Sequence, residues 1–393
     1  MLRLSSSLIQ EIWDNKLRME SMTRDVFSDF EGTFKDNKKT LPSGIVMNAK
    51  LPPSARTLTV GLLRNLDGAG VTGRTDQIGE EIDQVTKEVL LFSNDVSQAV
   101  NTERYGIDAH DKAAYRIIEA VQPQLSRWHQ EIKGRYIREA LLERYSINLT
   151  VAPISRTKRF NENILVTGVT LANQPVYDST ASDYEENIGD AMTTMSTNAF
   201  DVALLNAAQE FTVATKTLEP RANGRYIFLV PSNQAVLLKD PAATTSISGL
   251  FKDSHVIEAA TNAYRQYLGS WGIFDLFEDT RAPLIARTGS DGSFVITAFY
   301  KGAGADDDRT PLPAGTLADV GFILSDGAVS IAQHDALHFE EEIQNYKKVI
   351  GVGAFAGYGA NRLVFDDEGS ETDTSEINQN SIAVLASHNA ITA

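Results

Sequence analysis

Residues 108–145 read DAHDKAAYRIIEAVQPQLSRWHQEIKGRYIREALLERY, and this stretch decides the fold. Its apolar positions recur at steps of three or four residues, which is the spacing of one face of an α-helix. They are Ala114, Ile118, Val121, Leu125, Trp128, Ile132, Tyr136 and Ala140. A helix of this length spans on the order of 55 Å, longer than a small domain is wide. We therefore predict a helix that braces an extended body rather than one that lines a compact enzyme pocket.

The ends of this stretch carry the residues that a helix favours. Asp108 is suited to cap the first turn, and Asp111 places negative charge where the helix dipole favours it. Pro123 lies inside the stretch and removes one backbone hydrogen bond, so we expect the helix axis to bend there.

The composition sets the class of protein. The chain has 393 residues, of which 42% are hydrophobic, enough for two or three domains or one elaborate one. Lysine and arginine number 36 against 52 acidic residues, giving a formal charge of −16, which argues against tight nucleic-acid binding by the overall field. Residues 101–160 are mildly basic, with 11 Lys/Arg against 7 Asp/Glu, so any contact with DNA is expected to be local, weak and non-specific.

Cysteine is absent, which excludes disulfides, thiolate metal sites and a cysteine nucleophile. This fits a reducing compartment or an assembly stabilised at its interfaces. The opening residues lack the apolar core of a signal peptide, and no run approaches the roughly 18 apolar residues of a membrane span. We expect a soluble protein without a membrane partner.

Before the helix, the sequence predicts two extended features. Residues 1–40 mix seven basic and seven acidic residues with scattered aromatic side chains, which is typical of an arm that packs on something else. Residues 56–62 and 87–92 are β-rich and flank a long glycine-containing stretch, so a protruding hairpin is expected within residues 45–100.

After the helix, strands and helices alternate, which predicts a mixed α/β layer. The polar stretch 178–187 is a candidate boundary before this unit. Helices are expected over 192–208, from 232 onward and over 255–267. Strands are expected over 148–153, 164–171, 226–231, 274–277, 294–300, 320–324, 342–352, 362–365 and 382–385.

Two motifs suggest enzyme chemistry. Gly68-Ala69-Gly70-Val71-Thr72-Gly73 matches the dinucleotide-binding fingerprint, which needs a buried strand before it and a tightly packed helix after it. The flanking residues are polar, so a hairpin tip is the favoured interpretation. His334-Asp335-Ala336-Leu337-His338 resembles a zinc-protease motif, but Asp replaces the general base and the segment reads as strands and a turn. No cofactor, metal site or catalytic set is therefore predicted.

The order of arm, hairpin, long helix, α/β unit and returning strands resembles the major capsid proteins of tailed bacteriophages with the Hong Kong 97-type fold. Within that group the chain is most similar to the capsid family of Schitoviridae-related podophages. The segments that carry the resemblance are Leu66-Asp67-Gly68, Gly79-Glu80-Glu81, Arg127-Trp128, Val230-Pro231-Ser232, Asn345-Tyr346 and the glycine-punctuated stretch Val349 to Phe365.

The resemblance implies an α+β fold and a division of the chain. Its parts would be an N-terminal arm (1–44), an extended β-hairpin loop (45–100), a peripheral domain with a spine helix (101–187), an axial domain (188–325) and returning strands (326–393). Contacts between subunits would then involve Trp13, Phe27, Phe30, Gly68, Gly70, Gly73, Glu80 and Glu81.

The resemblance also implies a function. Hexamers and pentamers of the chain would form an icosahedral head around double-stranded DNA, assembled in the bacterial host cytoplasm with scaffold, portal and decoration proteins as further partners. The alternatives are a nucleotide- or metal-dependent enzyme and another virion component, such as a decoration or tail protein.

Overall fold

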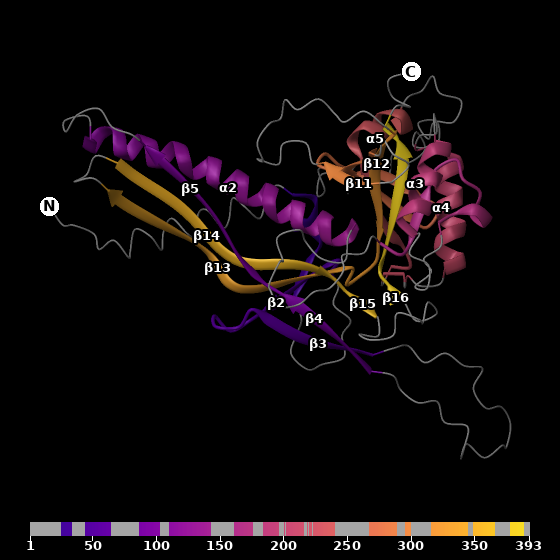
Figure 1. The fold of residues 1–393 in the computed structure, drawn as a ribbon, viewed down its shortest axis with the longest axis horizontal. Helices are drawn as coiled ribbons and strands as arrows, with labels where there is room; N and C mark the ends of the chain where they lie inside the picture. Colours follow the sequence, from indigo (N-terminus) through magenta and orange to yellow (C-terminus); the bar gives the residue numbers. More distant parts are fainter. Residues whose placement is uncertain are drawn as a thin grey trace, which may run out of the picture.

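The computed structural model describes most of the chain between residues 25 and 388. The described residues are 25–33, 44–63, 86–102, 110–142, 161–175, 184–195, 200, 202–215, 218, 220–221, 223–239, 267–288, 295–299, 316–344, 349–365 and 378–388. Figure 1 shows an elongated part, in which a long helix runs along a sheet, joined to a more compact part with a second sheet and shorter helices.

The long helix, α2, covers His110–Leu142. Its predicted apolar face is confirmed wherever side chains are described. Val121, Leu125, Tyr136 and Ala140 are buried, and Trp128 and Ile132 pack against the same cluster. The helix is continuous through residue 123, so the bend expected at the proline is not a break, and its angle stays a prediction.

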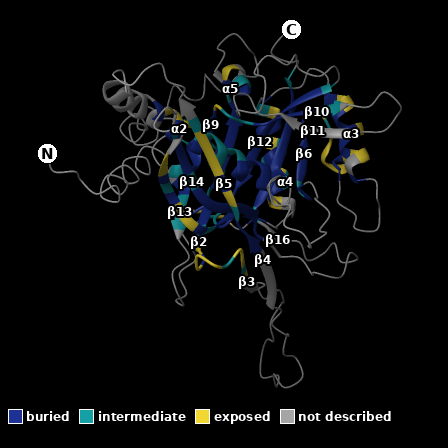
Figure 2. Ribbon diagram, turned by 60° about the vertical axis from the view of Figure 1, so that its left-hand side comes forward, coloured by how far each residue is buried: buried dark blue, intermediate teal, exposed yellow. Residues whose placement is uncertain are grey.

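A five-stranded sheet lies under this helix (Figure 1). Its strands are ordered β1 (Glu31–Thr33), β2 (Val46–Lys50), β13 (Val329–Gln344), β14 (Val349–Arg362) and β5 (Asn94–Thr102). Alternate residues of β14 face α2 and are buried, from Val352 through Tyr358. β5 forms one edge, and its residues 97–99 are exposed (Figure 2).

The prediction of one strand over 342–352 is wrong. β13 and β14 pair antiparallel, with Gln344 opposite Val349, so the chain reverses between them. Ile343, Tyr346 and Val349 are strand-favouring residues, and their spacing does not mark the reversal, although Asn345 is of a type that favours turns.

The second sheet has eight strands. Six of them follow the order β11 (Val295–Phe299), β10 (Leu284–Thr288), β12 (Thr316–Leu324), β7 (Tyr226–Pro231), β9 (Phe274–Asp279) and β8 (Tyr267–Trp271). β17 (Ser381–Ser387) also pairs with β12, and β6 (Ile164–Val166) pairs with β17. Two strands from outside residues 188–325 therefore complete the sheet of the predicted axial domain.

Helices flank the second sheet. They are α3 (Tyr184–Met195), α4 (Val202–Thr215) and α5 (Ser232–Lys239). β7 is buried along its whole length, and α5 follows it directly, as predicted. The single helix predicted over 192–208 is wrong, because α3 ends at Met195 and α4 begins at Val202. The sequence between them, Ser196-Thr197-Asn198, consists of residue types that favour helix ends over helix interiors.

A separate hairpin pairs β3 (Thr57–Leu63) with β4 (Thr86–Phe92) in continuous antiparallel register, which confirms that two extended arms meet. The segment predicted as a hairpin, 45–100, is longer than this pair, because its two ends, β2 and β5, belong to the five-stranded sheet. Residues 64–85 lie outside the described part. A short pair, β15 (Val364–Phe365) with β16 (Asn378–Gln379), completes the strands.

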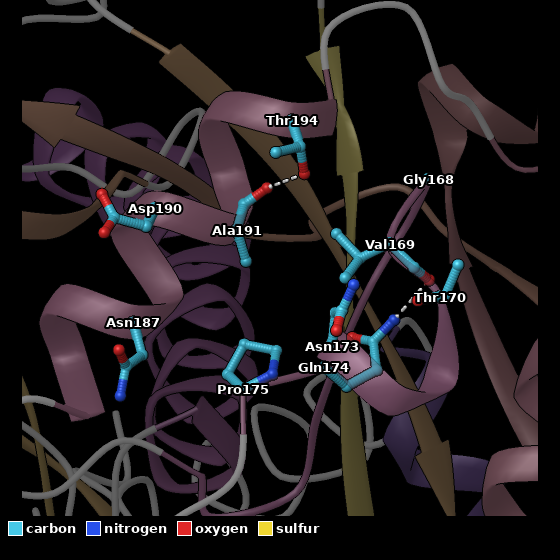
Figure 3. A pocket seen from close by; sticks show the side chains of 10 residues that line it. All are labelled: Gly168, Val169, Thr170, Asn173, Gln174, Pro175, Asn187, Asp190, Ala191 and Thr194. Carbon is cyan, nitrogen blue, oxygen red and sulfur yellow. Dashed lines mark hydrogen bonds between the residues drawn. The ribbon is translucent and has the colours of Figure 1, made fainter.

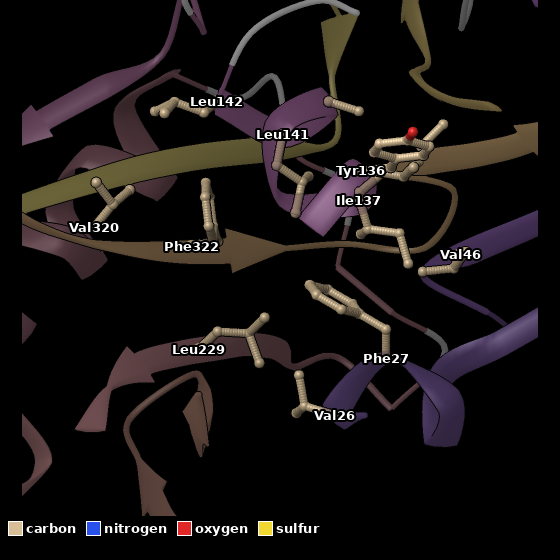
Figure 4. Close-up of a cluster of buried hydrophobic side chains, with 14 of the residues drawn as sticks. Val26, Phe27, Val46, Tyr136, Ile137, Leu141, Leu142, Leu229, Val320 and Phe322 are labelled. Atoms are coloured by element: carbon tan, nitrogen blue, oxygen red, sulfur yellow. The ribbon is translucent and has the colours of Figure 1, made fainter. Parts of the chain in front are cut away.

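One hydrophobic cluster joins the two parts of the molecule (Figure 4). It contains Ile137 and Leu141 from the end of α2, Phe322 from β12, and Phe27 from η1 (Val26–Phe30), a 3-10 helix. The two sheets thus share this cluster, and a second cluster, which includes Leu205 of α4 and Phe228 of β7, belongs to the eight-stranded sheet and its helices. In the described part of the chain, no helix is long and apolar enough to cross a membrane.

Candidate functional site

The predicted contact residues fall into two groups. Phe27 and Phe30 are 1% and 7% exposed, so their side chains are taken up by the core of their own chain and are not offered to a neighbour. The others lie outside the described residues, and their role stays a prediction. They are Trp13, Gly68, Gly70, Gly73, Glu80 and Glu81.

A polar cluster holds the root of the β3–β4 hairpin. His334 on β13 lies against Ser93, which separates β4 from β5, and against Arg56, which precedes β3. Its Nε2 atom is also 3.0 Å from Oδ1 of Asp95 on β5. A Cβ atom on Gly357 would overlap the imidazole ring, so the absence of a side chain there makes room for it. The cluster thereby ties the hairpin to the middle of the five-stranded sheet.

An ion pair between Arg56 and Asp95 forms part of this cluster. The hydrogen bond from Arg56 lowers the pKa of Asp95 below its ordinary value, against a smaller opposing effect of burial, and His334 lowers it further. The same hydrogen bond raises the pKa of Arg56. Both side chains are largely exposed, so this pair orients the hairpin root more than it stabilises the fold.

The zinc-protease interpretation requires a helix at residues 334–338, and the structure has a strand there. His334 is buried at the hairpin root, whereas His338 stacks on Phe355 at a centroid distance of 5.7 Å. Two irregularities in the β13–β14 register lie between these histidines. Among the described residues, no group of three His, Asp or Glu side chains could hold a metal ion. The glycine fingerprint at residues 68–73 lies outside the described part.

A surface cavity of about 750 Å³ lies beside α3 (Figure 3). It is lined by Gly168, Val169, Thr170, Asn173, Gln174, Pro175, Asn187, Asp190, Ala191 and Thr194. The buried Gln174 side chain is already used: its Oε1 accepts from the Val166 N–H at 2.7 Å, and its Nε2 donates to the Val166 and Val169 carbonyls. The Thr194 hydroxyl donates to the Ala191 carbonyl at 2.7 Å, and the Asp190 carboxylate faces Arg287 at 3.8 Å, so these two described lining residues do not form a hydrogen-bonded nucleophile and base.

Buried ion pairs connect the two parts of the molecule. Arg362 at the end of β14 donates to Glu162, just before β6, at 2.7 Å, and both side chains are almost fully buried. Arg138 on α2 pairs with Asp279 at the end of β9, again with both side chains 2% exposed. No pattern in the sequence indicates these pairs, whose partners are far apart along the chain. The one local signal near Arg138 is Gly134, a glycine in the interior of a helix.

Comparison with known proteins gives a likeness in fold. No family model and no curated protein matches the sequence. The capsid of Ralstonia phage GP4 is 15% identical over 88% of this chain and 87% of that chain, with a TM-score of 0.54. The capsid asymmetric unit of cyanophage Pam1 is 14% identical over 93% of both chains, with a TM-score of 0.56. The head structure of Helicobacter pylori bacteriophage KHP40 is 13% identical over 93% and 91%, with a TM-score of 0.54.

At these identities the likeness establishes the fold. The chain has the α+β Hong Kong 97-type fold of phage capsid structures, as the sequence predicted. The match extends over nearly the whole of each compared chain, so it includes the long helix and both sheets. The narrower resemblance to Schitoviridae-related podophages stays a prediction.

Proposed function

We propose that this chain is a major capsid protein, and that it assembles through hexamers and pentamers into the icosahedral head around double-stranded phage DNA. The observation that carries this proposal is the extent of the fold match, which covers 93% of this chain and 93% of the cyanophage Pam1 capsid chain. A match confined to one sheet would leave many functions open, because common folds host unrelated functions.

The shape of the molecule supports this role. An elongated body braced by α2, with a hairpin attached at its side, presents more surface to neighbours than a compact domain of the same length (Figure 1). Closed shells need repeated interfaces between identical copies. The large polar clusters described above are all used to hold the subunit together, which leaves no convergent set for catalysis among them.

The two alternatives have weaker support. The metal-dependent enzyme requires a helix at residues 334–338, where the structure has strand β13. The nucleotide-dependent enzyme rests only on the glycine pattern at residues 68–73. A decoration or tail protein remains the second candidate, since a shared fold does not by itself separate virion components. We propose scaffold, portal and decoration proteins as partners during assembly in the host cytoplasm, with weak DNA contact from the mildly basic region around α2, where the Arg127 side chain is 70% exposed.

The test is electron microscopy of the protein expressed alone and together with the neighbouring genes of its phage. We expect icosahedral shells, or free hexamers and pentamers. A protein that stays monomeric under every condition would contradict the proposal, and tubes or rings of one fixed size would favour a tail protein. Native mass spectrometry of the same sample tests the enzyme alternative, because a bound nucleotide or zinc ion would support it.

A further inference from the structure

The junction between α2 and the eight-stranded sheet is built around one buried cation. Arg138 donates from Nε to Oδ2 of Asp279 at 2.7 Å and from Nη2 to Oδ1 at 2.6 Å, a bidentate pair between helix and sheet. Burial opposes the charge of Arg138, but the charges of Asp279 and Asp25 outweigh burial and raise its pKa above the ordinary value. Asp279 also accepts from the Arg281 backbone N–H at 3.0 Å.

A segment near the N-terminus enters this junction. Nη2 of Arg138 also donates to Oδ1 of Asp25 at 3.2 Å, and the guanidinium lies over the Phe27 ring at 5.0 Å. Phe30 meets Phe277 of β9 edge-on, with ring centroids 5.1 Å apart. Residues 25–31 therefore touch both the helix and the second sheet. We call this segment the wedge.

The helix provides a fitted surface for the wedge. A Cβ atom on Gly134 would overlap the Asp25 carboxylate and lie 2.7 Å from Nη1 of Arg138. Glycine is among the least favourable residues in a helix interior, because it loses the most backbone freedom. Here it leaves room for the close approach of the Asp25 carboxylate. Lys133, which directly precedes Gly134, pairs with Glu31 at the end of the wedge.

The two carboxylates at Arg138 are not equivalent. Asp279 is 2% exposed and bound through both oxygens, whereas Asp25 is 11% exposed, is held at 3.2 Å, and has an Oδ2 atom with no hydrogen-bond partner in the described structure. Two carboxylates share the Arg138 guanidinium, and separating Asp25 from it costs less free energy than separating Asp279. The Arg138–Asp279 pair between helix and sheet stays in place when Asp25 separates.

We propose that the wedge fixes the angle between α2 and the eight-stranded sheet, and that Asp25 is its separable anchor. A docked wedge fills the corner between the two parts and holds them in one orientation. An undocked wedge leaves that corner unfilled, while the Arg138–Asp279 pair, the Arg362–Glu162 pair and the rest of the shared cluster still join the two parts.

The test uses the absence of cysteine in the chain. Spin labels on Gln124→Cys and Val236→Cys, both exposed positions on α2 and α5, report the distance between the two parts. Labelled protein is diluted into unlabelled protein, so that only distances within one chain contribute in any assembly state. Asp25→Asn and Gly134→Ala are compared with Gly61→Ala, a glycine whose added Cβ meets nothing.

We expect a narrow distance distribution for the parent and for Gly61→Ala, and a shifted or broadened one for both wedge variants. Hydrogen exchange at residues 27–30 should rise roughly tenfold or more in these variants, the effect of losing one charge-assisted hydrogen bond. Faster exchange with an unchanged distance would show that the wedge does not set the angle. Unchanged exchange in Asp25→Asn would show that Asp25 is not the anchor. Neither readout requires shells, so a failure of the proposed function leaves this test intact.

Discussion

His129 lies on the buried side of α2, with its ring edge-on to that of Tyr358 at a centroid distance of 5.3 Å. Its Nδ1 atom finds no hydrogen-bond partner in the described structure. Burial, and to a smaller degree the charge of Lys133, lowers its pKa from the ordinary 6.5 to about 3. The folded protein therefore keeps this imidazole neutral over most of the acidic range.

This burial predicts a pH dependence of stability. Below pH 6.5 the unfolded chain binds a proton at residue 129, whereas the folded chain does not bind it until about pH 3. The free energy of unfolding should therefore fall by about 1.4 kcal/mol for each unit by which the pH decreases across this window. Urea titrations of the parent and of His129→Phe at pH 7, 6 and 5 measure it, and we expect the variant to lose this part of the slope.

The matched control is His338→Phe, because His338 is partly exposed and stacks on the sheet surface. It separates the effect of the buried position from the general effect of replacing a histidine by phenylalanine. Carboxylates titrate in the same window, so the difference between parent and variant is the quantity that decides. Identical slopes for the parent and His129→Phe would show that residue 129 is not buried as a neutral group.

Among the elements, those with a strong local pattern were predictable from the sequence. The spacing of apolar residues predicts α2, and an unbroken apolar run predicts β7. The polar residues directly after β7, from Ser232, predict the start of α5. These elements bury whole faces, and burial leaves a period in the sequence. The β13–β14 reversal leaves no such period. Between α3 and α4 the apolar spacing continues from Met195 through Ala199 to Val202, and it hides the helix-ending residues that lie there.

Contacts between distant residues were not predictable. Arg138 and Asp279 are 141 positions apart, and His334 and Asp95 are 239 apart, so no local spacing connects them. The few apolar residues around Phe27 and Phe30 favour contact with a neighbouring subunit, yet both side chains are buried in the core of their own chain. A sparse apolar segment has no core of its own, and sequence alone does not tell which surface covers it.

The hairpin element carries a prediction about assembly. The paired part, β3 with β4, is anchored by the cluster at His334, so shortening the far end should leave the body folded. We expect deletion of residues 69–73 to reduce shell formation strongly while the thermal unfolding midpoint of the subunit changes by less than about 2 °C, since no described core residue is removed. Electron microscopy and circular dichroism provide the two readouts.

A deletion of equal length elsewhere serves as the control. Residues 366–370 lie in the acidic stretch after β15, and their removal should leave shell formation near the parent level if that stretch takes no part in assembly. Normal shells from the 69–73 deletion would contradict the role of the hairpin tip. Loss of shells from both deletions would point to a general folding defect instead.

At the scale of the whole molecule, the two parts are joined by one shared hydrophobic cluster, to which the wedge contributes Phe27 and Phe30, and by two buried ion pairs. Arg362 on β14 pairs with Glu162 just before β6, and Arg138 on α2 pairs with Asp279 on β9. Breaking a buried pair by removing one partner costs roughly 3–5 kcal/mol, so these pairs resist separation of the sheets. If the chain forms the proposed shell, we expect its flexibility to come from features with weaker anchors, such as the hairpin and the wedge.

The net charge of the subunit sets the last prediction. Each copy carries a formal charge of −16, so two copies that approach one another repel over a long range. In the proposed shell, the contacts between subunits must outweigh this repulsion. Salt screens this repulsion, since the Debye length shrinks from about 30 Å at 0.01 M to about 8 Å at 0.15 M ionic strength. We expect shell assembly from purified subunits to become faster and more complete as sodium chloride rises over this range, measured by light scattering, with circular dichroism verifying that the subunit stays folded. If assembly instead weakens with salt, attraction between opposite charges at the interfaces outweighs the repulsion of the net charge, and the acidic surface is arranged to meet basic patches on neighbouring copies.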